Sequence, residues 1–211
     1  MFTIITETHK LIAGHIHSHL EDRYGINLDK KQFLKGSIAP DVEPQYKLNR
    51  HYIDYSLNFV VAKIVKLIYL NKLLNQSPRQ TFQSKYMSKE LGVISHYLCD
   101  FVTQPHNERN KFKRLFKSHL KYEYILHQVA LHHDFEKDII NIPDMNIMEF
   151  DGMSLAKGIA RYINSVVDEY TQKESFKNDL NYAMSLNVKV MEFVVETVFL
   201  YADEVSYSIS Y

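Results

Sequence analysis

Residues 91–106 read LGVISHYLCDFVTQPH, and this stretch sets the fold class that we expect for the whole chain. His96 and Asp100 are four positions apart, so on a helix they lie one turn apart on the same face and can bind one cation. The opposite face is apolar and contains Ile94, Leu98 and Phe101. Pro105 ends the helix and places His106 just beyond it. The spacing therefore predicts a helix with one packed face and one metal-binding face.

The same helical periodicity continues along the chain. Gly and Pro are scarce, with 6 and 5 copies in 211 residues, and apolar residues recur at intervals of three and four. The sequence therefore predicts an all-α fold, a single-domain helical bundle that spans residues 1–211. The predicted helices cover residues 6–24, 52–75, 88–102, 108–133, 154–170 and 175–204. Predicted loops cover residues 36–44, 77–78, 104–105 and 142–152.

Composition restricts the classes of function. The 25 basic and 25 acidic side chains balance, so no net charge attracts the chain to nucleic acid or to a membrane. Cys99 is the only cysteine, which excludes an intramolecular disulfide and a cysteine-based zinc site. The first 20 residues carry charges and histidines where a signal peptide needs an apolar segment. No apolar run approaches the roughly 20 residues that span a bilayer, and we expect a cytoplasmic protein.

A second histidine–carboxylate pair repeats the spacing of the first. His119 and Glu123 are also four positions apart, on a face that contains Phe112, Leu115, Leu126 and Ala130. Burying an unpaired carboxylate is costly, which favours a cation nearby. A hydrogen bond on the helix surface is the simpler interpretation of either pair alone. Together with His106, however, the two pairs offer too many ligands for one tetrahedral zinc, and they indicate a multinuclear site.

The first predicted helix adds another candidate ligand, His9. It lies in the middle of an apolar stripe formed by Ile12, Ala13, Ile16 and Leu20. A single histidine that faces a core is more often hydrogen-bonded than metal-bound, so His9 needs support from other residues. The same helix has a histidine at every second position of residues 15–19, a pattern similar to a metal-binding tract. For these residues, His15, His17 and His19, we expect ordinary solvated or edge positions.

Five blocks of residues 6–123 resemble the bacterial zinc-dependent phospholipase C family, which is related to single-strand-specific plant and fungal zinc nucleases. In chain order they are Thr8-His9, Gly36-Ser-Ile-Ala-Pro40-Asp41, His51-Tyr-Ile-Asp54, the string from His96 to His106, and His119-Leu-Lys-Tyr-Glu123. The string His-Tyr-Leu-x-Asp-x-x-x-Gln-Pro-x-His is highly specific. Here Pro105 directly precedes His106, while the span from Asp100 to His106 is the family's own.

The resemblance implies an α-helical fold with a zinc cluster at the bottom of a cleft. The implied ligands of one zinc are His51, His96 and Asp100, with Asp41 beside them. Those of a second are His106, His119 and Glu123, and those of a third are His9 and a shared Asp100. Asp41 resembles the carboxylate that orients or deprotonates the attacking water. Secreted members complete the third site with an N-terminal Trp, which this sequence lacks, so the resemblance implies two or three Zn²⁺ per chain.

The implied activity is that of a zinc-dependent phosphoester hydrolase, phospholipase C-like, in which a metal-activated water cleaves a phosphodiester or phospholipid substrate. One alternative is a non-catalytic helical protein with structural zinc, although structural sites are normally closed and have no use for Asp41. Another is an HD-type metal phosphohydrolase, because His133-Asp134 reproduces the dipeptide of that family.

The remaining signals are weaker. A basic stretch near His119 is most simply a solvated helix face, and the alternative is contact with phosphate or an anionic lipid surface. It consists of Lys111, Lys113, Arg114, Lys117 and Lys121. The sequence implies no obligate protein partner. We place the metal site in residues 1–133 and a helical scaffold in residues 134–211, because the last two predicted helices contain no histidine.

Overall fold

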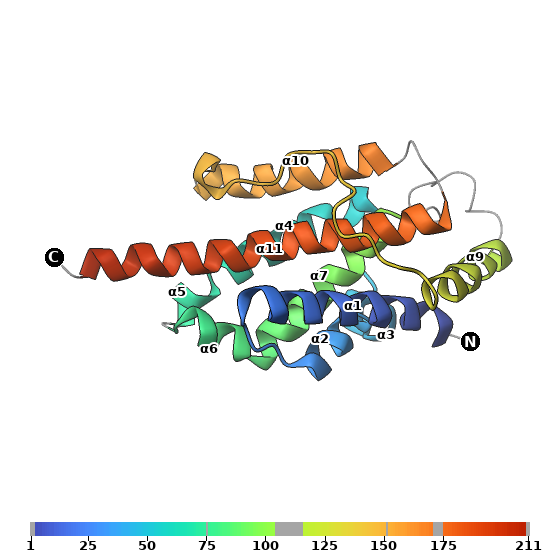
Figure 1. Ribbon diagram of the computed structural model, residues 1–211, viewed down its shortest axis with the longest axis horizontal. Coiled ribbons are helices and arrows are strands. Elements are labelled where there is room, and N and C mark those ends of the chain that lie inside the picture. The colour runs from blue at the N-terminus through green and yellow to red at the C-terminus, as the bar shows by residue number, and fades with distance from the viewer. Residues whose placement is uncertain (1–2, 75, 104–115, 151, 171–174, 210–211) are drawn as a thin grey trace.

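The protein is built from helices. The computed structural model describes residues 3–74, 76–103, 116–150, 152–170 and 175–209, and these ranges contain helices and connecting segments but no strand. The long helix α11 (Phe176–Ile209) follows the long axis of the molecule (Figure 1). It packs against α10 (Gly152–Tyr170) on one side, and against α1 (Thr3–Tyr24) and α7 (Lys85–Phe101) on the other. The predicted all-α class is confirmed.

Shorter helices surround these four. They are α2 (Lys30–Gly36), α3 (Ala39–Val42), α4 (Ile53–Ile68), α5 (Leu70–Leu74), α6 (Pro78–Gln83) and α9 (Phe116–Ala130), with 3-10 turns η1 (Pro44–Tyr46) and η3 (Ile147–Glu149). The predicted helix 52–75 is divided into α4 and α5, and the predicted loop 36–44 contains α3.

The predicted loop at residues 77–78 is confirmed for Ser77 and wrong for Pro78, which already belongs to α6. Ser77 and Gln80 form a capping box, in which each side chain bonds the backbone N–H of the other residue. Pro78 then occupies the first turn of α6, where its missing N–H costs nothing. The Ser-Pro pair therefore begins a helix. The predicted helix 108–133 corresponds to α9, and the first part of that prediction lies outside the described residues.

Two glycines bring α2 and α7 into direct backbone contact. A Cβ atom added to Gly92 would lie 2.1 Å from the carbonyl oxygen of Phe33 and 2.9 Å from Cα of Gly36. A Cβ atom added to Gly36 would lie 2.1 Å from the carbonyl oxygen of Lys89. Neither position has room for a side chain, so the two backbones set the distance between the helices. Ser37, the next residue after α2, is thereby placed beside α7.

One histidine of α1 is buried where the sequence predicted a solvated or edge position. His15 is exposed and His19 pairs with Glu192, but His17 is buried, with Nε2 3.1 Å from the carbonyl oxygen of Leu28. The prediction of a solvated or edge position for His17 is therefore wrong. The cause is a chain reversal directly after α1 at Gly25, whose φ of 59° suits glycine. The reversal brings the following segment back over α1.

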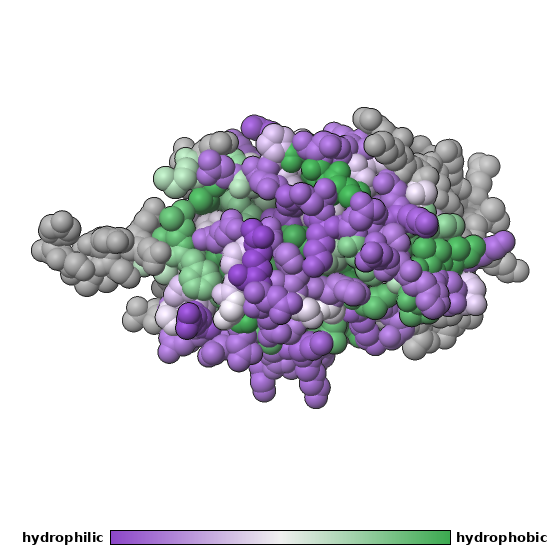
Figure 2. Space-filling view, in the orientation of Figure 1, coloured by the Kyte–Doolittle hydropathy of each residue, from purple (hydrophilic) through white to green (hydrophobic). Residues whose placement is uncertain are grey.

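The visible surface is mostly polar. On the face shown in Figure 2, hydrophilic side chains predominate and hydrophobic ones form separate patches. Among the described helices, none is long and apolar enough to cross a membrane.

Candidate metal centre

The structure brings together five of the predicted site residues from four separate parts of the chain. His9 comes from α1, Asp41 from α3, and His51 from the segment before α4, whereas His96 and Asp100 come from α7. Asp100 and His96 are almost completely buried, and His51 is the most exposed of the group, with a quarter of its side chain accessible. Residues that are far apart in sequence thus meet around one buried carboxylate.

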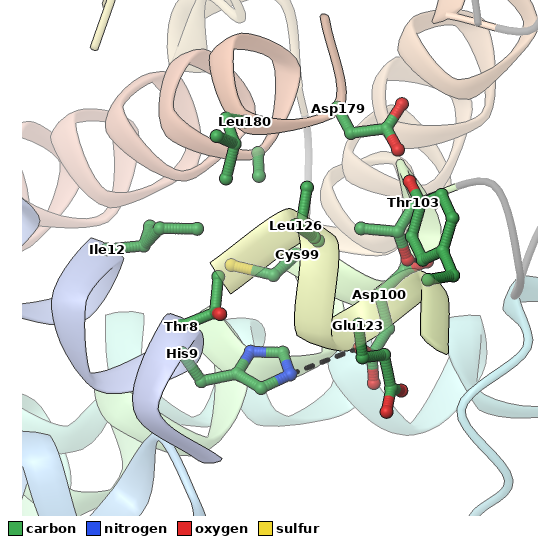
Figure 3. Close-up of a pocket in the computed structure, with 12 residues that line it drawn as sticks. Thr8, His9, Ile12, Cys99, Asp100, Thr103, Glu123, Leu126, Asp179 and Leu180 are labelled. Atoms are coloured by element: carbon green, nitrogen blue, oxygen red, sulfur yellow. Dashed lines mark hydrogen bonds and ion pairs between the residues drawn. The ribbon is translucent and has the colours of Figure 1, made fainter. Parts of the chain in front are cut away.

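The two oxygens of Asp100 face different histidines. Oδ2 lies 2.7 Å from Nδ1 of His51 and 3.1 Å from Nε2 of His96. Oδ1 lies 3.3 Å from Nε2 of His9, the ion pair drawn as a dashed line in Figure 3. The ring of His9 also stacks on that of His96, with centroids 4.0 Å apart. A carboxylate with histidine nitrogens beside both of its oxygens can be shared between two cations.

Asp41 completes the group on the Oδ2 side. Its Oδ1 lies 3.8 Å from Nδ1 of His51 and 3.7 Å from Nε2 of His96, and these two nitrogens are 3.2 Å apart. Zinc–ligand bonds of about 2.0–2.2 Å place neighbouring tetrahedral ligands roughly 3.3–3.5 Å apart. The observed separations lie on both sides of that range. Oδ2 of Asp41 is buried with no hydrogen-bond partner among the described residues. The donor set therefore fits zinc.

A backbone contact fixes the orientation of His96. Its Nδ1 lies 2.8 Å from the carbonyl oxygen of Ser37 and donates its hydrogen there. The other ring nitrogen, Nε2, then carries a lone pair and faces Asp41 and Asp100. Outer contacts of this kind are typical of histidines that bind metals. The close approach of α2 and α7 holds the Ser37 carbonyl in place.

The charges of the histidines follow from burial and from the nearby carboxylates. Burial lowers the pKa of His9, but the charge and hydrogen bond of Asp100 more than offset it, so the pKa is raised well above 6.5. The pKa of His51 is raised by the same balance, with Asp41 adding to the effect of Asp100. The pKa of His96 is lowered, by burial and then by the charge of His9. Protons on His9 and His51 thus supply positive charge that a metal ion would replace.

Glu123 on α9 lies beside this cluster. Together with His9 and Asp100 it lines both the open cleft and a small inner cavity, which is shown in Figure 3. His119 belongs to the preceding turn of α9, but its side chain is outside the described residues, as is the whole of His106. The ligand set of His106, His119 and Glu123 therefore stays a prediction.

The open cleft gives the cluster access to solvent. Its volume is about 370 Å³, and its floor contains His9, Asp41, His51, Asp100 and Glu123. The remaining lining comes from the segment between α3 and α4, namely Tyr46, Lys47, Asn49, Arg50 and Tyr52. Lys47 and Arg50 are exposed basic residues, and cations at the mouth of a cleft attract anionic groups such as phosphate.

Comparison with known protein families shows to which family the chain belongs. Residues 8–205 match the model of the family described as zinc dependent phospholipase C. The chain belongs to this family. The match continues through α10 and α11, beyond residue 123, where the recognisable motifs of the sequence end. No curated protein and no solved structure matches the chain.

Family membership and the geometry of the site both indicate metal binding. The zinc-dependent phospholipase C match includes all the predicted ligands, and the described residues contain two groups that could hold an ion. One group is His9, His96 and Asp100, and the other is Asp41, His51 and His96. Neither group includes His133, which instead contacts Oδ1 of Asn181. These observations favour the phospholipase C family over the HD-type alternative.

Two contacts around the candidate metal centre were not predicted. The Ser37 carbonyl is a backbone acceptor, and no residue type in the sequence signals it. Oγ1 of Thr8 lies 3.2 Å from Nδ1 of His127, and this contact joins α1 to α9 beside His9. His127 follows Glu123 by four positions, so the helical spacing that identified the other pairs could have revealed it.

Of the predicted basic stretch, residues 111–115 lie outside the described part of the chain, and Lys121 is exposed.

Proposed function

We propose that the chain is a phospholipase C-like hydrolase that cleaves a phosphodiester, with a phospholipid as the substrate class. The observation that carries the proposal is the shared carboxylate of Asp100, with a histidine group on each of its oxygens, at the floor of an open cleft. Structural zinc sites are normally closed. A cluster that opens into a cleft has room for water and a substrate phosphate, so the arrangement favours catalysis over a purely structural role.

The proposed ligands are the eight residues predicted from the resemblance. They are His9, Asp41, His51, His96 and Asp100, together with His106, His119 and Glu123. When bound, zinc lowers the pKa of water and neutralises charge on phosphoryl oxygens. We propose two or three Zn²⁺ per chain, held within residues 1–133 of a single domain in which residues 134–211 are the scaffold.

The side chains have distinct proposed roles in hydrolysis. Oδ2 of Asp41, which is buried without a hydrogen-bond partner among the described residues, accepts the proton of the attacking water. His96 keeps its lone pair directed at the site because Ser37 holds its other nitrogen. Lys47 and Arg50, at the cleft, attract the phosphate and position it by hydrogen bonds to its oxygens.

The test separates metal binding from catalysis. Elemental analysis of the purified protein should find about two or three zinc ions per chain. The substitution Asp41→Asn removes the proton acceptor but keeps an oxygen ligand, so zinc should remain while hydrolysis falls by about 10²–10⁴-fold. Asp22→Asn, at an exposed position on α1, is the matched control and should change neither.

Two results would contradict the proposal. The assay panel contains phosphatidylcholine, single-stranded DNA and a small soluble phosphodiester. Full zinc loading without hydrolysis of any of these substrates would favour the non-catalytic alternative. An Asp41→Asn variant that retains both zinc and full activity would remove Asp41 from the mechanism.

A further inference from the structure

A single turn at the cleft carries the most exposed large hydrophobic side chain among the described residues. Leu48 is 93% exposed and directly follows Lys47, in the segment between η1 and α4. The residues on either side, Lys47 and Asn49, both line the cleft, whereas Leu48 is not among the lining residues. Leu48 therefore projects into solvent next to the entrance of the proposed active site.

Anchored neighbours keep Leu48 in this position. Tyr46 is buried, and its carbonyl oxygen accepts the backbone N–H of Asn49 at 2.9 Å. The carbonyl oxygen of Asn49 in turn accepts the hydroxyl of Tyr97, a fully buried residue of α7, at 3.2 Å. The turn is thus attached to the core on both sides of Leu48. Because these contacts fix the backbone, the exposed leucine is a feature of the fold.

The surroundings of Leu48 combine apolar, aromatic and basic groups. Val42, the last residue of α3, and Tyr55, in the first turn of α4, are 52% and 56% exposed. The guanidinium of Arg50 lies 5.1 Å from the centre of the Tyr55 ring. Of the acidic neighbours, Glu43 is paired with Lys89, and Asp54 remains at the surface. Long basic side chains next to an aromatic ring and an exposed leucine are typical of surfaces that enter the headgroup region of a membrane.

We propose that residues 42–55 form the surface by which this protein docks on a phospholipid bilayer. Leu48 enters the boundary between headgroups and acyl chains, and Lys47 and Arg50 contact headgroup phosphates. This inference rests on the proposed function, because a phosphodiester held in a bilayer reaches the cleft only if the cleft mouth lies against the membrane. One projecting leucine with two basic neighbours is too small a patch for a stable protein–protein interface, which buries about 800 Å² per partner.

The experiment compares two leucine variants of the zinc-loaded, full-length protein. Leu48→Asp removes the inserting side chain, and Leu73→Asp is the matched control, because Leu73 is 69% exposed on α5, at a distance from α3 along the molecule in Figure 1. Sedimentation measures binding to vesicles of phosphatidylcholine alone and of phosphatidylcholine mixed equally with phosphatidylglycerol. Hydrolysis is measured on the same vesicles and on a small soluble phosphodiester.

We expect Leu48→Asp to weaken vesicle binding by about tenfold, because the substitution removes apolar surface that would otherwise enter the bilayer. Vesicle hydrolysis should fall in parallel, with hydrolysis of the soluble substrate unchanged, and Leu73→Asp should behave like the wild type. Binding should be tighter with phosphatidylglycerol present and should weaken with salt, because Lys47 and Arg50 contribute electrostatically.

The results separate this inference from the proposed function. Equal vesicle binding by the wild type and Leu48→Asp would overturn the docking surface, as would a wild type that binds neither kind of vesicle. If the wild type hydrolyses no phosphodiester but its vesicle binding still depends on Leu48, the docking surface stands and the hydrolase function fails.

Discussion

The two central helices α7 and α11 both bury polar side chains, but they do so in different ways. On α11, two buried side chains have matched partners: Asp179 accepts the hydroxyl of Tyr170 at 2.6 Å, and Asn181 donates to Glu136 at 2.8 Å. Around α7, imidazole nitrogens of His9, His51 and His96 all lie within 3.3 Å of one carboxylate. The hydrogen bonds of the first arrangement are complete, whereas in the second the lone pair on Nε2 of His96 faces the carboxylates of Asp41 and Asp100, and a cation between them would be stabilised.

This difference distinguishes α11, which supports the fold, from α7, which carries residues of the metal site. Buried polar pairs such as those of α11 satisfy hydrogen bonds and specify packing. A buried cluster of nitrogen and oxygen ligands is stable only with added positive charge, which either protons or metal ions can supply. The following predictions test whether the two helices really differ in this way.

The largest effect should come from matched substitutions of one aspartate on each helix. Asp100→Asn removes the shared carboxylate charge, and zinc affinity should fall by more than about a hundredfold, since even outer-contact losses cost 10–100-fold. Asp179 also lines the inner cavity, but it already accepts the Tyr170 hydroxyl. Asp179→Asn should therefore leave zinc affinity unchanged and lower the free energy of unfolding by about 1–3 kcal/mol, from the weakened bond with Tyr170. Calorimetric zinc titration and denaturant unfolding measure the two quantities. Equal loss of zinc in both variants would contradict the assignment of the metal site to α7 and of the scaffold to α11.

A smaller effect should follow from changing the contact between α2 and α7. Gly92→Ala places a Cβ atom 2.1 Å from the Phe33 carbonyl, so the backbones must separate. We expect a loss of about 3 kcal/mol of unfolding free energy, from overpacking in the core. Gly14→Ala on α1 is the control, since its Cβ would meet no atom within 4 Å, and it should be neutral or slightly stabilising. A Gly92→Ala variant as stable as Gly14→Ala would show that the contact does not constrain the fold.

The smallest effect should appear in the pH dependence of the metal-free protein. The raised pKa values of His9 and His51 mean that the folded state holds their protons more tightly than the unfolded state. Their contribution to stability is fully present below pH 6.5 and is lost as pH rises through the raised values. Zinc needs deprotonated rings, so its stabilising effect should grow over the same rise.

Thermal unfolding with chelator and with zinc, across this pH range, measures both trends. His51→Gln should flatten the slope of the metal-free protein, whereas the same change at the exposed His15 should not. A slope that is identical in the wild type and His51→Gln would show that these protons do not contribute to stability.

The sequence predicted the parts of the fold and the site that depend on local spacing. The pair of His96 and Asp100 follows from one helical turn, and the all-α class follows from the same periodicity over the chain. Bringing Asp41 and His51 to that pair required the family resemblance, because their proximity depends on how separate elements pack. The burial of His17 was missed for the same reason, since it depends on the reversal at Gly25.

The contact of Gly36 with Gly92 also bears on how this site can evolve. The chemical form of His96 depends on a backbone oxygen, which every amino acid at position 37 would supply. The tautomer of His96 therefore depends on Gly36 and Gly92, two residues that contact neither metal nor substrate. A relative could carry another small residue at position 37, which is fully buried, and keep this contact, whereas loss of either glycine would disturb His96 without any change in His96 itself.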